Sequence, residues 1–562
     1  MSIIIEKSQN SVKDAIMDAL SKAIAEGLLP AEPIPSFIIE VPSDRSHGDL
    51  STNVAMVSAR AFKMAPAKIA DIIIDCIDLS STYATKVEKA GPGFINFFLS
   101  NRFYSDILKD IEEKGDKYGR SDMGKGQSID VEFVSANPTG PMHIGNARGG
   151  ALGDTLAGVL DAAGYDVTRE FYINDAGNQI EKFGLSLETR YLQLFDDTIE
   201  MPEDAYHGKD IIDHVIAFKE EYGDKYVNVD SVERKKALVD FALPKNIAAL
   251  ETDLRKYRIE YDVWYRESSL HQSGDVKKII DLLTEKGHTY ESDGAIWFKA
   301  SNFGDEKDFV LVRQNGIPTY VVPDIAYHYN KLVTRGFDRA IDVLGADHHG
   351  YVPRLKAALA ALDIDPNRLD VVLMQMVRLV RSGEIVKLSK RSGKAITLVT
   401  LLDEVPIDAA RFFFNLREPN THCEFDLDLA VEESSENPVY YVQYAHARIC
   451  SIIKNLAAEG ISYESLSAEK LDVLSCPEET ELIRFLASFT DEIKNSAKAL
   501  DPSKITRYAL QTATLFHKFY NACRVKGDDK DLMLARLFLC VSTKTVLKNI
   551  LDILKIDAPE TM

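Results

Sequence analysis

A segment early in the chain combines a glycine-rich turn, a histidine and the start of a helix. It spans residues 135–150 and reads SANPTGPMHIGNARGG. Residues 129–134 before it are rich in β-branched and aromatic side chains, which favours a strand. Ala, Leu and Gly at helical spacing run from Asn146 to Leu160, and Gly164 is placed to end the helix. Because a helix N-terminus offers unpaired N–H groups and positive dipole charge, this pattern predicts a site for nucleotide phosphates.

Within the turn, His143 has the clearest chemical use. We expect its imidazole to donate a hydrogen bond to a nucleotide phosphate and to stabilise negative charge while pyrophosphate is displaced. Asn146 is expected as the N-cap of the helix, and Gly145 lets a phosphate or a ligand ring approach the backbone closely. The alternative is a histidine that only packs or caps a turn. Pro141 and Gly145 around His143 favour the nucleotide site.

A second segment, far along the chain, is strongly basic. Residues 387–394 read KLSKRSGK and place four cations in eight positions. They follow residues 377–386, in which two short alternating runs flank a Ser-Gly turn, so we expect a small hairpin and then a basic loop. Cations there suit a triphosphate that is attacked at its α-phosphorus. Lys387 and Lys390 could also be ordinary surface lysines, but their spacing favours phosphate binding.

The two segments together resemble the nucleotide signatures of class I aminoacyl-tRNA synthetases. Residues 143–146, HIGN, correspond to the HIGH signature, and residues 387–391, KLSKR, to the KMSKS signature. Asn146 replaces the usual second histidine, and Leu388 replaces methionine. Further stretches resemble arginyl-tRNA synthetases in particular: VEFVSANPTGP at 131–141, HGDLSTN at 47–53, GPGFIN at 91–96, YINDAG at 172–177 and IDAPE at 556–560.

The resemblance implies an ATP site built from both signatures and from strand ends between them. Gly345 and Asp347 follow a predicted strand, where a carboxylate suits ribose hydroxyls, although a simple turn carboxylate is the alternative. Mg²⁺ is expected to accompany ATP. The residues implied to act in catalysis are His143, Asn146, Lys387 and Lys390. Those implied to bind ATP are Pro138, Gly140, His143, Gly145, Asn146, Gly345, Asp347, Met376, Val377, Ser389, Lys390 and Arg391.

Recognition of arginine requires a carboxylate that can pair with both arms of a guanidinium group. Asp324 is the best candidate, because the apolar residues around it in 318–326 would make an unpaired carboxylate costly. The resemblance adds Tyr320, four positions earlier, Asn137 for the α-amino or carboxylate group, and His348 in the pocket wall. For Tyr320, core packing with a satisfied hydroxyl remains an open alternative.

The chain is long enough for several domains, and we expect a multidomain α/β protein with three of them. Residues 1–120 alternate helical and extended patterns, and the resemblance implies that this domain contacts tRNA. Residues 121–406 are expected to form a Rossmann-like parallel sheet, interrupted at about 180–292 by a largely helical, acidic insertion. Beyond about residue 407, strand signals vanish, and helices are predicted at 438–458, 478–499, 505–525 and 531–554, which the resemblance implies bind the anticodon.

Two aromatic and basic clusters mark this helical region. The first contains Tyr440, Tyr441, Tyr444, His446 and Arg448, and the second Phe516, His517, Phe519, Tyr520, Asn521 and Arg524. Unpaired RNA bases are read by stacking and by hydrogen bonds to their edges, so Tyr444, Arg448 and Arg524 are predicted to contact tRNA. Packing in a helical core explains most of the aromatic residues equally well.

Composition excludes several classes of protein. A hydrophobic content of 45%, a charged content of 27% and the lack of an 18-residue apolar run or a secretory signal favour a cytoplasmic protein with no membrane partner. The six cysteines contain no Cys-x-x-Cys pair, so neither a disulfide framework nor a zinc site is expected. The net charge of −21 disfavours nucleic-acid binding, and DNA is not an expected partner, yet residues 378–394 and 504–548 are locally basic.

These features lead to one expected function, arginine–tRNA ligase. ATP and L-arginine would form arginyl-adenylate and pyrophosphate, and the terminal adenosine of tRNA(Arg) would then attack the mixed anhydride. The family implies a monomer that must bind tRNA before it activates arginine. The alternatives are another class I synthetase such as glutaminyl, a smaller nucleotidyltransferase with a related turn, and a non-catalytic tRNA-binding paralogue. Length and the helical C-terminus disfavour the nucleotidyltransferase, and the presence of both signatures disfavours the paralogue.

Overall fold

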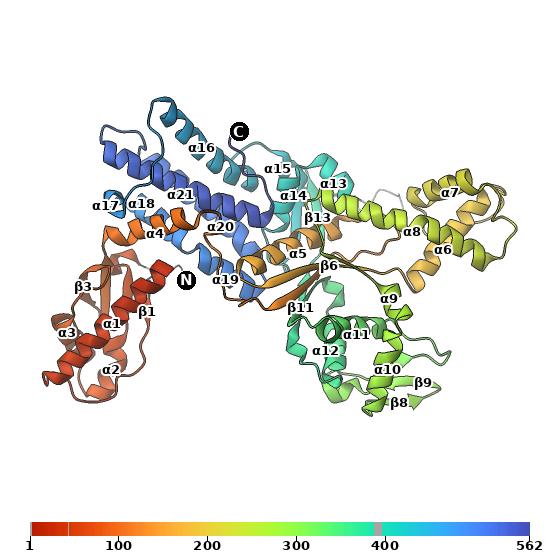
Figure 1. The fold of residues 1–562 in the computed structure, drawn as a ribbon, viewed down its shortest axis with the longest axis horizontal. Coiled ribbons are helices and arrows are strands. Elements are labelled where there is room, and N and C mark those ends of the chain that lie inside the picture. The colour runs from red at the N-terminus through yellow and green to blue at the C-terminus, as the bar shows by residue number, and fades with distance from the viewer. Residues whose placement is uncertain (1–2, 43, 387–395) are drawn as a thin grey trace.

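The computed structural model describes residues 3–42, 44–386 and 396–562. A small α/β domain lies at one end, a parallel sheet at the centre, a helical arm opposite, and a group of long helices over the middle (Figure 1). The predicted multidomain α/β class is confirmed.

The first domain packs three helices against an antiparallel sheet. Its helices are α1 (Ile3–Ala25), α2 (Val54–Phe62) and α3 (Pro66–Cys76). The sheet order is β1-β2-β4-β3, with β1 at Ile39–Glu40, β2 at Leu50–Thr52, β3 at Ala84–Ala90 and β4 at Phe94–Leu99. Helices and strands therefore alternate along this part of the chain, as the sequence pattern predicts. Helix α4 (Asn101–Lys114) leads out of this domain.

The central sheet has five parallel strands in the order β12-β11-β5-β6-β7. They are β5 (Ser128–Phe133), β6 (Asp166–Ile173), β7 (Val263–Arg266), β11 (Arg339–Gly345) and β12 (Leu369–Met374). Helix α5 (Ile144–Ala162) connects β5 to β6 and packs on both. Because later strands are added on both sides of β5, the strand order reverses between β5 and β11, where open α/β sheets bind ligands.

The insertion forms the helical arm and then returns to the sheet. Helices α6 (Asn178–Gln193), α7 (Lys209–Tyr222) and α8 (Ser231–Lys256) share a small core that contains Phe183, Tyr191 and Phe218. The expectation of one helical interruption over 180–292 was wrong in one respect, because the sheet strand β7 lies inside it. This strand has only four residues, too few for a periodic signal.

A second α/β layer follows the arm. It contains α9 (Glu267–Gln272), α10 (Asp275–Glu285), α11 (Val321–Tyr329) and α12 (Val352–Ala361). A three-stranded antiparallel sheet joins them, formed by β8 (Thr289–Ser292), β9 (Ala295–Phe298) and β10 (Phe309–Val312). Helices α11 and α12 pack together below the edge of the central sheet (Figure 1).

The predicted hairpin before the basic segment is confirmed. Strands β13 (Val377–Arg381) and β14 (Glu384–Ile385) pair antiparallel, and Ser382 and Gly383 between them have positive φ angles of 52° and 76°. A third strand, β15 (Cys423–Asp426), pairs in parallel with β13. The expectation that strands vanish beyond about residue 407 was therefore wrong.

The remaining elements are helical. They are α13 (Leu398–Glu404), α14 (Ile407–Phe414), α15 (Leu427–Val431), α16 (Pro438–Ala458), α17 (Ala468–Leu471), α18 (Pro477–Ala487), α19 (Phe489–Ala499), α20 (Ser503–Ala522) and α21 (Lys530–Leu554). The helix expected over 478–499 is two helices, which meet at Ser488 without a glycine or proline to mark the break.

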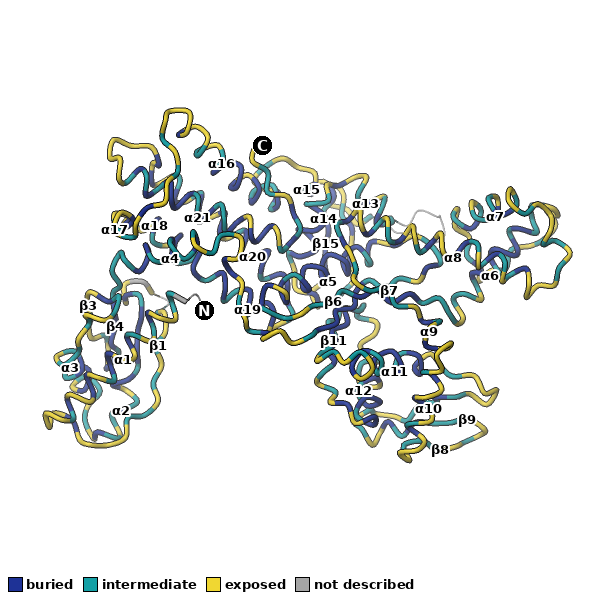
Figure 2. The backbone as a smooth tube through the Cα atoms, viewed as in Figure 1, coloured by how far each residue is buried: buried dark blue, intermediate teal, exposed yellow. Residues whose placement is uncertain are grey.

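The long helices and the central sheet share one core. Buried residues of β5, α5, α16, α20 and α21 form a single hydrophobic cluster, visible as the dark interior in Figure 2. The fully buried Arg411 crosses this core, because its guanidinium donates to Asp154 Oδ2 in α5 (2.6 Å) and to the carbonyl oxygen of Leu554 in α21 (2.8 Å). Arg411 of α14 therefore links α5 to the end of α21.

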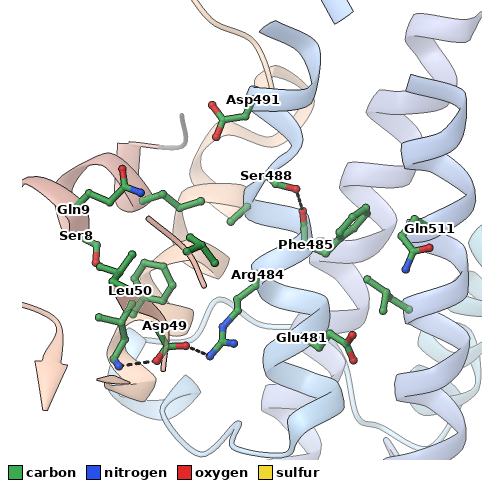
Figure 3. Close-up of a pocket in the computed structure, with 16 residues that line it drawn as sticks. Ser8, Gln9, Asp49, Leu50, Glu481, Arg484, Phe485, Ser488, Asp491 and Gln511 are labelled. Atoms are coloured by element: carbon green, nitrogen blue, oxygen red, sulfur yellow. Dashed lines mark hydrogen bonds and ion pairs between the residues drawn. The ribbon is translucent and has the colours of Figure 1, made fainter. Parts of the chain in front are cut away.

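The first domain contacts the helical region through an ion pair. Asp49 beside β2 pairs with Arg484 of α18, and the hydroxyl of Tyr104 donates to the same carboxylate (3.2 Å). Figure 3 shows this pair at the edge of a cavity of about 380 Å³ between α1, β2 and α18. The side chain of Asp49 is only 11% exposed, so its partner matters for stability.

We predict that Arg484→Ala lowers the free energy of unfolding by about 3 kcal/mol, because it leaves a largely buried carboxylate without its cation. Urea denaturation followed by circular dichroism measures this. Lys518→Ala in α20, which breaks an exposed pair with Glu481 of α18, is the matched control and should leave the midpoint nearly unchanged. Equal midpoint shifts in the two variants would contradict the prediction.

Candidate functional site

A cavity of about 600 Å³ lies where the strand order of the central sheet reverses. Its wall is formed by the chain after β5, β11 and β12, the first turn of α5, and parts of α11 and α12. The predicted residues that line it are His143, Gly145, Asn146, Asp324, Gly345, Asp347, His348 and Met376. Residues from the first signature and the predicted guanidinium partner therefore face one space.

The start of α5 has a different cap from the one we expected. His143 is the N-cap, and its Nδ1 accepts a hydrogen bond from the N–H of Gly145 (3.1 Å). Asn146 is the third helical residue, and its Oδ1 accepts from the N–H of His143 (3.0 Å). The assignment of Asn146 as N-cap was therefore wrong, because the two side chains form a reciprocal capping box. Since Nδ1 is an acceptor, the neutral imidazole carries its proton on Nε2, where it is a donor.

The chain that follows the basic segment is attached directly to this turn. Thr397 forms an isolated antiparallel bridge with His143, and the N–H of Leu398 donates to the carbonyl oxygen of Met142 (2.9 Å). On the other side of the segment, Val386 donates to the carbonyl oxygen of Leu379 (2.9 Å). Lys387, Ser389, Lys390 and Arg391 themselves lie outside the described residues, so their contact with ATP remains a prediction.

The segment at 374–376 forms another part of the wall, and Arg148 holds it in place. This arginine lies one turn into α5 and is fully buried. Its guanidinium donates to the carbonyl oxygens of Gln375 (2.5 Å), Glu418 (3.1 Å) and Thr421 (3.0 Å). Sequence reasoning missed Arg148, although an arginine on the buried stripe of a glycine-rich helix needs fixed acceptors and was a usable signal.

Some predicted residues do not reach the cavity. The carbonyl oxygen of Pro138 accepts a hydrogen bond from Asn246 of α8 (2.9 Å), and Gly140 lies close to Asp210 of α7. This part of the turn therefore contacts the helical arm. Val377 is buried in β13. Asn137 is exposed in the turn, and Tyr320 is 68% exposed, with its ring centre 6.1 Å from that of Tyr351.

Asp324 lies in an acidic wall of the cavity. The hydroxyl of Tyr351 donates to its Oδ2. Burial raises the pKa of Asp324 to about 7, and the hydrogen bond from Tyr351 opposes this shift. Glu267 and Glu132 lie near enough to raise it further. A cavity with this charge suits a cationic ligand such as a guanidinium group.

Beneath this wall lies a buried charge network centred on Lys331. Its Nζ lies 2.7 Å from Glu132, 3.0 Å from Asp130 and 3.2 Å from Asp342. Burial alone would lower the pKa of Lys331, but the carboxylates outweigh it and hold that pKa well above its ordinary value. Lys331 lies in a π-helical turn, Asn330–Thr334, directly after α11.

The network extends to the cavity through residues that sequence reasoning also missed. His328 Nε2 lies 2.8 Å from Asp342 Oδ2, and Glu132, His328 and Asp342 all line the cavity. The usable signal was the presence of Asp130, Glu132 and Asp342 inside strands that are buried on both faces. Such carboxylates require cationic or hydrogen-bonding partners.

Comparison with known proteins identifies the family. Residues 108–452 match the family of class I tRNA synthetase (R) catalytic domains, residues 10–99 the arginyl tRNA synthetase N-terminal domain, and residues 442–562 the DALR anticodon binding domain. The arginine–tRNA ligase of Caldanaerobacter subterraneus subsp. tengcongensis is 58% identical over 562 residues, and that of Acetivibrio thermocellus 55% over 564, each with full coverage of both chains. The chain belongs to the arginyl-tRNA synthetase family.

Solved structures agree with this assignment at the level of the fold. The arginyl-tRNA synthetase of Thermus thermophilus superposes with a TM-score of 0.73 at 21% identity, covering 99% of this chain and 100% of that one. That of Plasmodium falciparum gives 0.68 at 20% identity and covers 99% of each. The predicted catalytic, N-terminal and anticodon-binding architecture is confirmed for this synthetase.

In the helical region of the synthetase, the two aromatic and basic clusters meet on one surface. The ring centre of Tyr444 in α16 lies 5.9 Å from that of His517 in α20, and the guanidinium carbon of Arg448 lies 4.2 Å from the ring centre of Tyr520. Arg524 is exposed beyond the end of α20. Some members of the clusters point inward instead: Phe516 and Phe519 are buried, and His446 Nδ1 lies 2.8 Å from the carbonyl oxygen of Pro559.

Among the residues that the structure describes, Cys476, Glu479 and Cys523 form the one group with spacing compatible with a metal ion. Among the same residues, no helix combines the length and apolar character needed to cross a membrane.

We predict that Lys331→Met destabilises the synthetase by about 3 to 5 kcal/mol, because it leaves three buried carboxylates without their shared cation. Urea denaturation followed by circular dichroism should show a much lower midpoint. Lys236→Met, which breaks an exposed pair with Asp240, serves as control and should behave like the unchanged chain. An unchanged midpoint for Lys331→Met would show that the network is not structural.

Proposed function

We propose that this arginine–tRNA ligase forms arginyl-adenylate in the cavity between the start of α5 and α11. One observation carries the proposal: the His143 turn and the carboxylate of Asp324 line the same space. A carboxylate oxygen of arginine attacks the α-phosphorus of ATP, and pyrophosphate leaves. The terminal adenosine of tRNA(Arg) then attacks the carbonyl carbon, and AMP leaves. Positioning and electrostatics suffice for both steps, without a covalent enzyme intermediate.

The nucleotide is held mainly by the first signature and the strand ends. The Nε2 of His143 and the positive end of the α5 dipole meet the phosphates, and Asn146 holds the backbone of His143 in place. Asp347 after β11 accepts from the ribose, Gly345 leaves room for it, and backbone groups at Met376 and Val377 meet the adenine edge. Pro138 and Gly140 shape the turn. Lys387, Ser389, Lys390 and Arg391 complete the phosphate site, with Mg²⁺ accompanying ATP.

Arginine lies at the acidic side of the cavity. Its guanidinium pairs with Asp324, supported by the negative charge of Glu132 and Glu267. His348 belongs to the cavity wall. Tyr320 and Asn137 contact arginine only after moving toward the cavity, because both stand outside its lining in this structure. The arginine site is therefore completed by a rearrangement.

The partner is tRNA(Arg), bound over three domains with proposed limits at 1–120, 121–406 and 407–562. Tyr444, Arg448 and Arg524 provide an aromatic and cationic surface for unpaired anticodon bases. The first domain contacts a more distant part of the tRNA. The enzyme acts as a cytoplasmic monomer without zinc, in keeping with the family resemblance.

The first test concerns Asp324. Since burial raises its pKa to about 7, the free site carries a neutral carboxylic acid at low pH, and KM for arginine should fall as the pH rises from about 6 to about 8. Asp324→Asn should raise KM for arginine by at least about 30-fold and remove this pH dependence. Pyrophosphate exchange in the presence of tRNA measures both effects. KM for ATP is the internal control, and an equal rise there would remove Asp324 from the guanidinium site.

The second test concerns the order of binding. Because Tyr320 and Asn137 stand outside the cavity, we expect no arginine-dependent pyrophosphate exchange without tRNA, and exchange once tRNA(Arg) is added. A tRNA with oxidised terminal ribose should still restore exchange, because it binds but cannot accept arginine. Exchange in the absence of any tRNA would contradict this order.

A further inference from the structure

Two cysteines of the helical region lie together where one helix starts and another ends. Cys476 is the N-cap of α18, and Cys523 is the C-cap of α20. Their sulfur atoms and a carboxylate oxygen of Glu479 all lie within 4.8 Å of one another. Neither cysteine takes part in the proposed reaction, so the pair needs its own explanation.

The surroundings of the two sulfurs do not suit a metal ion. Glu479 is already engaged, because its Oε2 accepts from the N–H groups of Ser475 and Cys476 (2.9 Å each) and its Oε1 accepts from Arg536 Nε (2.7 Å). Arg536 Nη2 also lies 4.0 Å from Cys476 Sγ. A metal ion here would face a guanidinium cation and have only two available thiols, whereas zinc requires about four ligands.

The same surroundings suit a sulfur that reacts as an anion. Arg536 and the N-terminus of α18 both lie beside Cys476 Sγ, and the nearby carboxylate of Glu479 is already paired with Arg536. Cys476 is partly exposed, whereas Cys523 is buried, and burial raises the pKa of the Cys523 thiol to about 12. A dissolved oxidant therefore reaches Cys476 first, and Cys523 is placed to react with the product.

We propose that Cys476 and Cys523 are a peroxide-sensitive pair that forms a reversible disulfide. Cys476 sulfur attacks one oxygen of hydrogen peroxide, the O–O bond breaks, and the released hydroxide takes the thiol proton to become water. Cys523 sulfur then attacks the sulfenic acid, the S–O bond breaks, and the second hydroxide takes the Cys523 proton. The thiols lose two electrons and the peroxide gains them, giving one disulfide and two waters.

The experiment treats the reduced full-length chain with a small excess of hydrogen peroxide, stops the reaction with an alkylating reagent and maps the peptides by mass spectrometry. We expect a peptide pair joined through Cys476 and Cys523, absent after treatment with dithiothreitol. Cys476 should react at least about ten-fold faster than the partly exposed Cys76 and Cys450.

Single substitutions separate the two roles. Cys523→Ser should trap Cys476 as a sulfenic acid that a 1,3-dione reagent labels, whereas Cys476→Ser should leave Cys523 unlabelled. Cys450→Ser is the matched control and should still form the joined peptides. The proposal fails if no joined pair forms, if Cys476 reacts no faster than Cys76 and Cys450, or if the reduced chain retains zinc in a manner that Cys476→Ser abolishes.

Discussion

The structure depends above all on one buried cation. Lys331 is surrounded by Asp130 and Glu132 from β5 and by Asp342 from β11, the two strands between which the strand order reverses. Three carboxylates in a sheet interior would repel one another without it. With it, they form a rigid acidic floor under the cavity, which keeps its shape and its negative charge.

The side of the cavity formed by the start of α5 follows a different principle, in which backbone contacts do most of the positioning. His143 and Asn146 cap each other, so the imidazole has one orientation before any ligand arrives. The bridge from His143 to Thr397 then joins this turn to the chain that follows the basic segment. Two regions far apart in the sequence are thereby fixed relative to each other by main-chain contacts.

Local patterns predicted local structure well. The turn at Ser382 and Gly383, the strand before His143 and the helix at 438–458 followed from residue preferences that no distant contact overrides. Strands β7 and β15 were missed because four-residue strands lack periodicity and form only through partners distant in the sequence. The Lys331 network was missed for a related reason, since a lone lysine after a helix gives no sign of three distant carboxylates. Only some of the site residues that the family resemblance implies line the cavity. Tyr320, for example, is exposed and does not line it.

The hydrogen bonds of Arg148 have a consequence for how the sequence of this enzyme can evolve. Arg148 holds the carbonyl oxygens of residues 375, 418 and 421, and every amino acid supplies such an oxygen. Substitutions at these three positions therefore leave the hydrogen bonds intact, whereas an insertion or deletion of one residue between 418 and 421 would shift an acceptor out of reach. Selection at residues 375, 418 and 421 should therefore act on the path of the backbone, while their side chains are free to vary.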